Sequence, residues 1–98
     1  MADLTVHDVE ARSPQAQLVD VREDAEVALG RIQGAIHIPL GQLPDRMGEL
    51  DPQRPVIAIC RSGNRSRQAM QALQAAGYAC DNMAGGMLAW QAAGLPTI

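Results

Sequence analysis

Short apolar segments alternate with helical patterns along the chain, and this alternation predicts the fold. Apolar or β-rich runs predict strands at residues 5–6, 18–21, 35–38, 56–59 and 78–83. Apolar positions at helical spacing predict helices at residues 23–29, 43–50, 66–76 and 87–93. Strands that alternate with helices are typical of a parallel sheet. We therefore expect an α/β fold with a mostly parallel central sheet and helices on both faces.

The run Val56-Ile57-Ala58-Ile59 is apolar at every position, as expected of an interior parallel strand that is covered on both faces. A polar turn and a helix follow it directly, so a strand, a turn and a helix meet at residues 60–65. Reactive groups of parallel sheets gather beyond the carboxyl ends of the strands. Cys60 occupies such an end.

The composition fits one ordinary globular domain. The chain has 98 residues, 47% of them hydrophobic and 19% charged, and shows no repeat or linker, so we expect a single domain over residues 1–98. Without Phe, and with one Tyr and one Trp, the core must consist mainly of aliphatic side chains and Met. The first residues do not resemble a signal peptide, and no run approaches the roughly 20 apolar residues of a membrane span. We expect a soluble cytoplasmic protein with reduced thiols and no membrane partner.

Positive charge is concentrated in one stretch of this mildly acidic chain. Residues 52–80 contain four arginines and no acid, which gives them a charge of +4 within a chain of net charge -3. The stretch is expected to attract a small anion. We expect no nucleic-acid partner.

The segment Cys60-Arg61-Ser62-Gly63-Asn64-Arg65-Ser66 places a thiol before a tight polar turn and a helix start. Gly63 permits a backbone conformation that is closed to most residues, Asn64 tolerates positive φ, and Ser66 can cap the helix. If the turn curls around the thiol, its N–H groups form an anion-binding concavity. Helix N-termini and nearby arginines lower a cysteine pKa from about 8.5 to roughly 3.5–7.5. Cys60 is therefore expected to be a nucleophile rather than a structural buried cysteine.

Four motifs follow one another along nearly the whole chain: Leu-Val-Asp-Val-Arg-Glu at 18–23, Gly-Ala-Ile-His-Ile-Pro at 34–39, the Cys60 segment at 60–66, and Gly-Gly-Met-Leu-Ala-Trp at 85–90. In this order and at this spacing, the four motifs resemble those of the rhodanese family. The resemblance implies a rhodanese-like fold and a two-step sulfur transfer. Cys60 would take sulfane sulfur from a donor such as thiosulfate and pass it from a persulfide to a thiophilic acceptor, which is cyanide in the usual assay.

The resemblance also implies roles for the residues of this segment. Cys60 would be catalytic, and the donor and persulfide would be bound by the turn, with backbone amides forming the cradle and Arg61 and Arg65 holding the anionic donor. The substrate-binding residues are then Arg61, Ser62, Gly63, Asn64 and Arg65, with Arg67 ranked below them. No cofactor or metal is required, because His7 and His37 show no metal-ligand spacing with the cysteines.

Other residues of these motifs are interpreted as structural. We favour a structural ion pair for Asp20 and Arg22, and packing roles for His37 and Trp90. The pair at residues 85–86 is expected to start the last helix and could also border the active pocket. Cys80 lies in a predicted strand, which favours an inert buried thiol over a resolving thiol that pairs with Cys60.

Two other functions compete with sulfur-transfer turnover. A cysteine phosphatase or arsenate reductase places an arginine six positions after its cysteine, whereas this position is Ser66 here and Arg65 comes one residue early. A persulfide carrier or rhodanese-like binding module would exchange sulfur with a donor or acceptor protein or thiol, without thiosulfate turnover. The sequence leaves this second alternative open.

Overall fold

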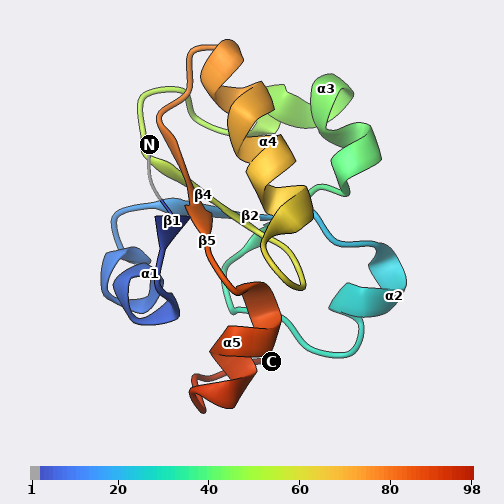
Figure 1. Ribbon diagram of the computed structural model, residues 1–98. Coiled ribbons are helices and arrows are strands. Elements are labelled where there is room, and N and C mark those ends of the chain that lie inside the picture. Colours follow the sequence, from blue (N-terminus) through green and yellow to red (C-terminus); the bar gives the residue numbers. More distant parts are fainter. Residues whose placement is uncertain (1–2) are drawn as a thin grey trace.

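Five short strands form one fully parallel sheet in the computed structural model, which describes residues 3–98 (Figure 1). The strands are β1 (Asp3–Leu4), β2 (Gln17–Asp20), β3 (Ile36–His37), β4 (Val56–Ile59) and β5 (Cys80–Met83). Their order in the sheet is β1-β5-β4-β2-β3, so β4 lies in the centre. This arrangement confirms the α/β prediction and the interior position of residues 56–59.

Five α-helices surround the sheet within residues 3–98, and four of them cover its two faces. They are α1 (Val6–Arg12), α2 (Asp24–Val27), α3 (Leu43–Arg46), α4 (Asn64–Ala75) and α5 (Gly86–Ala92), with short 3₁₀ turns at Leu40–Gln42 and Met47–Glu49. In Figure 1, α3 and α4 lie on one side of the sheet and α1 and α5 on the other. No helix within residues 3–98 is long and apolar enough to cross a membrane.

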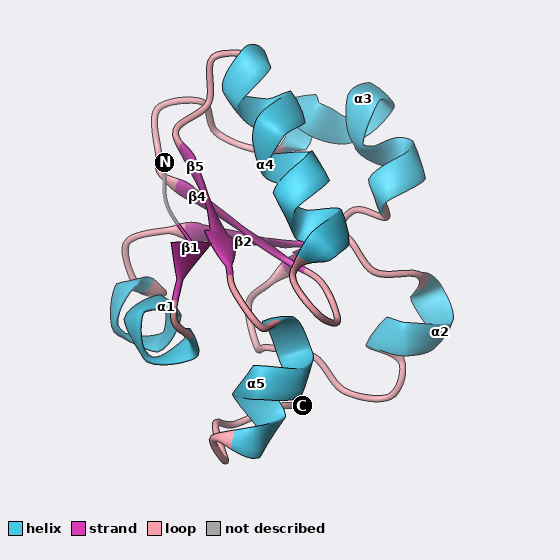
Figure 2. Cartoon of the chain, in the orientation of Figure 1, coloured by secondary structure: helices cyan, strands magenta, loops and turns pink. Residues whose placement is uncertain are grey.

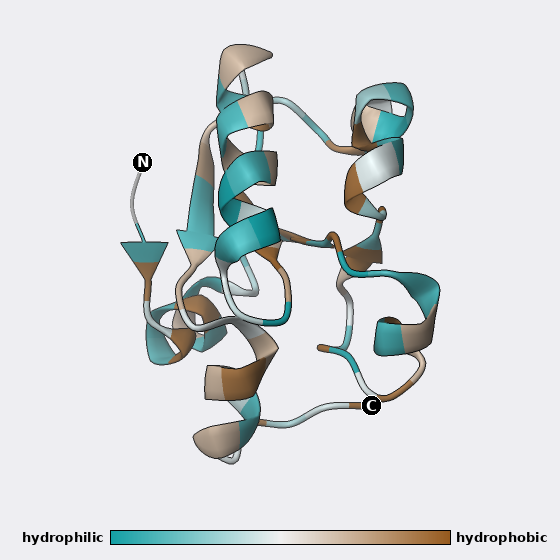
Figure 3. Ribbon diagram, turned by 45° about the vertical axis from the view of Figure 1, so that its right-hand side comes forward, coloured by the Kyte–Doolittle hydropathy of each residue, from teal (hydrophilic) through white to brown (hydrophobic). Residues whose placement is uncertain are grey.

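The side chains of β4 point alternately to the two faces of the sheet, and the core accordingly has two layers. Ile57 and Ile59 pack with α1 and α5, in a cluster that includes Val9, Met87 and Trp90. Val56, Ala58 and Cys60 face the other way and pack with α4, in a cluster that includes Ala69, Leu73 and Cys80. Successive side chains of a strand point to opposite faces, so the position of Cys60 in the strand directs its thiol toward α4. The outward surface of α4 is mostly hydrophilic (Figure 3).

The prediction of an edge strand at residues 5–6 was wrong. The first strand is Asp3–Leu4, and Thr5 caps α1, a helix that was not predicted from the sequence. The Thr5 hydroxyl accepts a hydrogen bond from the Asp8 N–H at 3.1 Å, and the Thr5 N–H donates to the Asp8 carboxylate at 3.2 Å. This capping box is a local helix signal. Only Val6 and Val9 of α1 are buried, which is too weak an apolar pattern to predict a helix.

The bounds of all four predicted helices differ from those in the structure, and the stretches at 23–29 and 87–93 form helices at Asp24–Val27 and Gly86–Ala92. The helix expected at residues 66–76 begins at Asn64, and the stretch at 43–50 is a short helix followed by a 3₁₀ turn. The earlier start of α4 matters for the site, because its first N–H groups lie close behind Cys60.

Candidate active site

Cys60 directly follows the central strand, and α4 begins only four residues later at Asn64 (Figure 2). Gly63 makes this short connection possible, since it caps α4 with φ of +103°. A Cβ atom at this position would also contact the backbone N of Gly85 at 3.3 Å. The turn is therefore folded tightly against the start of α5, and the first turn of α4 faces the sulfur.

The Cys60 sulfur is completely buried and is surrounded by hydrogen-bond donors. The Gly63 N–H donates to Sγ at 3.0 Å, and the Ser66 Oγ lies 3.2 Å from Sγ. Burial alone would raise the pKa of the Cys60 thiol. Hydrogen bonds from the Ser66 hydroxyl and from the N–H groups of Ser66, Gly63 and Ser62 outweigh burial, so this pKa lies below its ordinary value. These donors stabilise a thiolate.

Ser66 belongs to a buried polar chain that leads away from the sulfur. Its hydroxyl donates a short hydrogen bond to the Asn82 Oδ1. The Asn82 Nδ2 donates to the Asp3 carboxylate at 3.0 Å and to the Gly63 carbonyl at 3.2 Å. Both of these partners are acceptors, which fixes the amide orientation with Oδ1 toward Ser66. The single hydroxyl proton of Ser66 is thus shared between Cys60 and Asn82.

The start of α5 docks directly on the backbone of the Cys60 turn. The Met87 N–H donates to the Cys60 carbonyl at 2.9 Å, and the Leu88 N–H donates to the Arg61 carbonyl at 3.0 Å. A Cβ on Gly86, whose φ is +59°, would collide with those two carbonyls. The glycine pair therefore both starts the last helix and borders the site.

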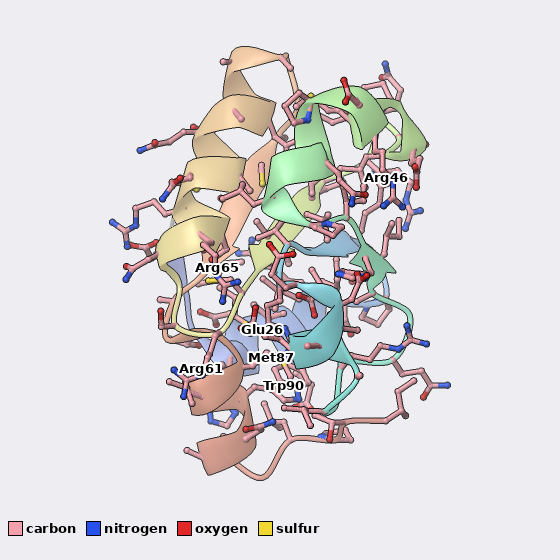
Figure 4. All side chains as sticks on the ribbon, turned by 90° about the vertical axis from the view of Figure 1, so that its right-hand side faces the viewer. Glu26, Arg46, Arg61, Arg65, Met87 and Trp90 are labelled. Carbon is pink, nitrogen blue, oxygen red and sulfur yellow. The ribbon has the colours of Figure 1, made fainter. Side chains whose placement is uncertain are left out.

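The arginines of the turn lie in different electrostatic settings. Arg65 forms a two-pronged ion pair with Glu26 of α2, with its Nη1 and Nη2 at 2.6 and 2.8 Å from the two carboxylate oxygens (Figure 4). Arg67 is bound by Asp3 at 2.9 Å. Arg61 is exposed, and no ion-pair partner for it occurs within residues 3–98. Among the three arginines near Cys60, only Arg61 is free to meet an incoming anion.

A cleft of about 270 Å³ adjoins this turn. Its lining includes Glu26 from α2, Leu29 just after α2, and Arg61 from the turn. Met87 and Leu88 of α5 also line it. Cys60 itself does not line the cleft, since its sulfur lies beneath the turn.

Comparisons with known proteins agree with this geometry. The Rhodanese-like domain family matches residues 5–93. The chain belongs to the rhodanese-like family. A sulfurtransferase of Allochromatium vinosum is 44% identical over 82 residues, which cover 83% of this chain and 77% of that protein. The Bacillus subtilis protein YtwF, provisionally named a sulfurtransferase, is 46% identical over 76% of this chain and 72% of its own.

The solved structure of a rhodanese-related protein from Thermoplasma volcanium superposes on this chain with a TM-score of 0.95 at 28% sequence identity. The matched residues cover all of this chain and 98% of that protein. The rhodanese-like fold predicted from the four segments is thereby confirmed. At the level of the family, the activity is sulfur transfer.

Asp20 and Arg22 of this rhodanese-like domain form a buried ion pair with a 2.8 Å contact. The Arg22 guanidinium also donates to the carbonyl of Gly30 at 2.9 Å and to that of Glu26 at 3.3 Å. The pair thus anchors α2 and the segment after it to the sheet. His37 is bound at 2.7 Å to the Arg22 carbonyl, and the Trp90 indole donates to the Pro96 carbonyl. These contacts agree with the structural roles expected for all four residues.

The second cysteine lies at the opposite end of the sheet from the site. Cys80 pairs in register with Val56, which is four residues before Cys60. A strand rises about 3.3 Å per residue, so the two cysteines are about 13 Å apart along the sheet, beyond the ~7 Å limit for a disulfide. Burial, followed by the charge of Asp81, raises the pKa of Cys80 to about 12. Both features favour the inert buried thiol.

Glu26 and Asn82 were not among the site residues predicted from the sequence. Asn82 had a detectable signal, because it is a polar side chain in the middle of a strand beside the central one. Glu26 had none, since its partner is 39 residues away. Within residues 3–98, no cluster of three or more His, Cys, Asp or Glu side chains is arranged to hold a metal ion.

Proposed function

We propose that this rhodanese-like domain transfers sulfane sulfur through a persulfide on Cys60. The observation that supports the proposal is the convergence of backbone N–H groups and the Ser66 hydroxyl on the Cys60 sulfur, at the N-terminus of α4. Such a site stabilises the thiolate before the reaction and the anionic persulfide after it.

The reaction has two steps. The Cys60 thiolate attacks the outer sulfur of the donor, a bond forms between the two sulfurs, and the bond from that outer sulfur to the rest of the donor breaks. With thiosulfate, the leaving group is sulfite, which takes the bonding electron pair. With an organic persulfide, the leaving group is the thiolate of the donor. An acceptor nucleophile, such as cyanide or a thiolate, then attacks the outer sulfur of the Cys60 persulfide. The Cys60 thiolate leaves and the site is regenerated.

The turn is the proposed substrate-binding segment. The N–H groups of Ser62, Gly63 and Asn64 would surround the transferred sulfur, and Arg61 would contact an anionic donor. Arg65 would offer such a donor the end of its guanidinium fork only after it releases Glu26. This occupied guanidinium favours a second candidate function, in which the domain exchanges sulfur with a persulfide-bearing protein or thiol in the cytoplasm. Thiosulfate turnover would then be a minor activity.

Phosphatase chemistry is a weaker candidate for the same thiolate. The position six residues after Cys60 is the buried Ser66, which hydrogen-bonds the sulfur. Arg65 is bound by Glu26, so the end of its guanidinium fork is not free for a two-pronged contact with a phosphate.

A donor-by-acceptor assay tests the proposal. The wild type should transfer sulfur from thiosulfate or from an organic persulfide to cyanide or to a thiol, and the rates of the four combinations show which partners it prefers. Cys60→Ser should abolish all four and leave the fold unchanged by circular dichroism. Retained transfer in a folded Cys60→Ser variant would overturn the proposal. Release of phosphate from a phosphate ester would support the phosphatase instead.

A further inference from the structure

The Glu26–Arg65 contact closes the place where an anionic donor was expected to bind. The Nη1 and Nη2 atoms of Arg65 contact separate oxygens of Glu26, so the end of the guanidinium fork is occupied and another anion is left only its Nε side. The side chains are 32% and 27% exposed, so the pair lies at the surface of the site and not in the core. Figure 4 shows them pointing toward one another from α4 and α2.

Glu26 keeps its negative charge throughout the working range of pH. Hydrogen bonds from Arg65 are the main reason that the pKa of Glu26 falls to about 2. On the other side of the pair, the hydrogen bonds to Glu26 raise the pKa of Arg65, and the Cys60 thiolate contributes in the same direction. Arg65 directly precedes Ser66, whose hydroxyl hydrogen-bonds the reacting sulfur, and the charge of Arg65 is already balanced by Glu26.

The surroundings of the pair suit an organic group better than an inorganic dianion. Beside Arg61, the lining of the cleft next to the turn includes Leu29, which is 88% exposed, and Leu88 of α5, which is 46% exposed. A dianion such as thiosulfate would bring two charges next to the Glu26 carboxylate. An organic persulfide carries no sulfonate oxygens, and its carbon skeleton can contact the apolar rim.

We propose that Glu26 determines donor specificity: its carboxylate occupies the Arg65 fork and directs Cys60 toward organic persulfides and away from inorganic dianions. This inference rests on the proposed sulfur transfer through Cys60. Glu26 acts through Arg65 and is a positioning residue, since it does not touch the reacting sulfur.

The test is the first half-reaction in Glu26→Gln, a nearly isosteric change that removes one negative charge. The rate constant for Cys60 persulfide formation is measured by rapid quench and mass spectrometry, with thiosulfate and with the persulfide of N-acetylcysteine amide, which has no other charged group. The rate with thiosulfate should rise about tenfold, which corresponds to about 1.4 kcal/mol. The rate with the organic persulfide should stay within about twofold.

Glu49→Gln is the matched control, because it removes the same charge from a comparable ion pair, with Arg46 at 2.8 Å, away from Cys60. It should change neither rate. A thiosulfate rate that is unchanged or lower in Glu26→Gln would overturn the inference, as would an equal change with both donors.

A binding measurement separates failure of this inference from failure of the proposed function. Sulfate, which cannot donate sulfur, should protect Cys60 from iodoacetamide about tenfold more effectively in Glu26→Gln than in the wild type. Equal protection in the two proteins would overturn the role of Glu26. Greater protection in the variant, in a protein that forms no persulfide with either donor, would show that Glu26 controls the access of anions to Arg65 and would overturn sulfur transfer.

Discussion

Replacing Ser66 by Ala should shift the titration of the Cys60 thiol to higher pH. The Ser66 Oγ lies 3.2 Å from Sγ and is completely buried, so no water molecule is expected to replace its hydrogen bond. Because the hydrogen bonds are what bring the pKa of Cys60 below its ordinary value, loss of the one from this hydroxyl must raise it. The N–H groups of the turn remain, so part of the lowering of the pKa should persist.

The magnitude follows from the worth of a hydrogen bond to a charged group. Such a bond contributes about 1.5–3 kcal/mol, and the lower value applies here because the Ser66 proton is shared with Asn82. About 1.5 kcal/mol lowers the thiolate fraction roughly tenfold at a pH below the midpoint. The more basic thiolate is intrinsically about threefold more nucleophilic, so the observed rate should fall about threefold. Above the midpoint the variant should react about threefold faster than the wild type.

The assay is the rate of iodoacetamide alkylation as a function of pH, in a Cys80→Ser background that leaves one thiol. The rate profiles of Ser66→Ala and of the parent should cross near the midpoints. Asn82→Ala provides the opposite perturbation, since it removes the competing acceptor and leaves the Ser66 proton to the thiolate. Its profile should move toward lower pH.

Two results would refute this reasoning. One is a Ser66→Ala profile that coincides with that of the parent. The other is a shift of Ser66→Ala and Asn82→Ala in the same direction, which would show that both act by loosening the turn. Urea unfolding provides a check on folding, because the unpaired Asn82 carbonyl should cost Ser66→Ala about 1–3 kcal/mol of stability.

Three further predictions concern residues around the turn. Cys80→Ser should retain most of the sulfur-transfer rate, whereas equal losses in Cys60→Ser and Cys80→Ser would indicate a dithiol mechanism. Gly86→Ala should lower the free energy of unfolding in urea by at least about 2 kcal/mol, because the added Cβ meets the carbonyls beneath α5; an unchanged midpoint would contradict this packing. Glu26→Gln should remove a contribution to stability that is present above pH 4.5 and is lost as the pH falls toward about 2, because Arg65 lowers the pKa of Glu26 in the folded state. If the free energies of unfolding of the wild type and the variant change in parallel with pH over this range, Glu26 makes no such contribution.

The sequence predicted the features that depend on local pattern. The apolar run of β4 has no polar position and therefore indicates burial on both faces, and the polar turn after it marks the end of the strand. Gly63 indicates a backbone conformation that the structure shows at φ of +103°. The predictions for the fold and for the place of Cys60 within it follow from these signals.

The features that the sequence could not predict depend on tertiary contact. The cluster of arginines indicates positive charge, but a linear pattern does not show that Glu26 and Asp3 come from distant elements to bind Arg65 and Arg67. The polar chain through Asn82 was missed for the same reason, since it joins three separate segments. The helix α1 was missed because its stability comes from a cap and two buried valines rather than from a full apolar stripe.

Mass spectrometry of the protein after exposure to a sulfur donor tests the central claim most directly. The wild type should gain the mass of one sulfur atom on the peptide that contains Cys60, and should lose it when a thiol or cyanide acceptor is added. The Cys60→Ser protein should gain nothing. A gain of sulfur on the Cys80 peptide, or no gain on the Cys60 peptide with either thiosulfate or an organic persulfide, would contradict a Cys60 persulfide.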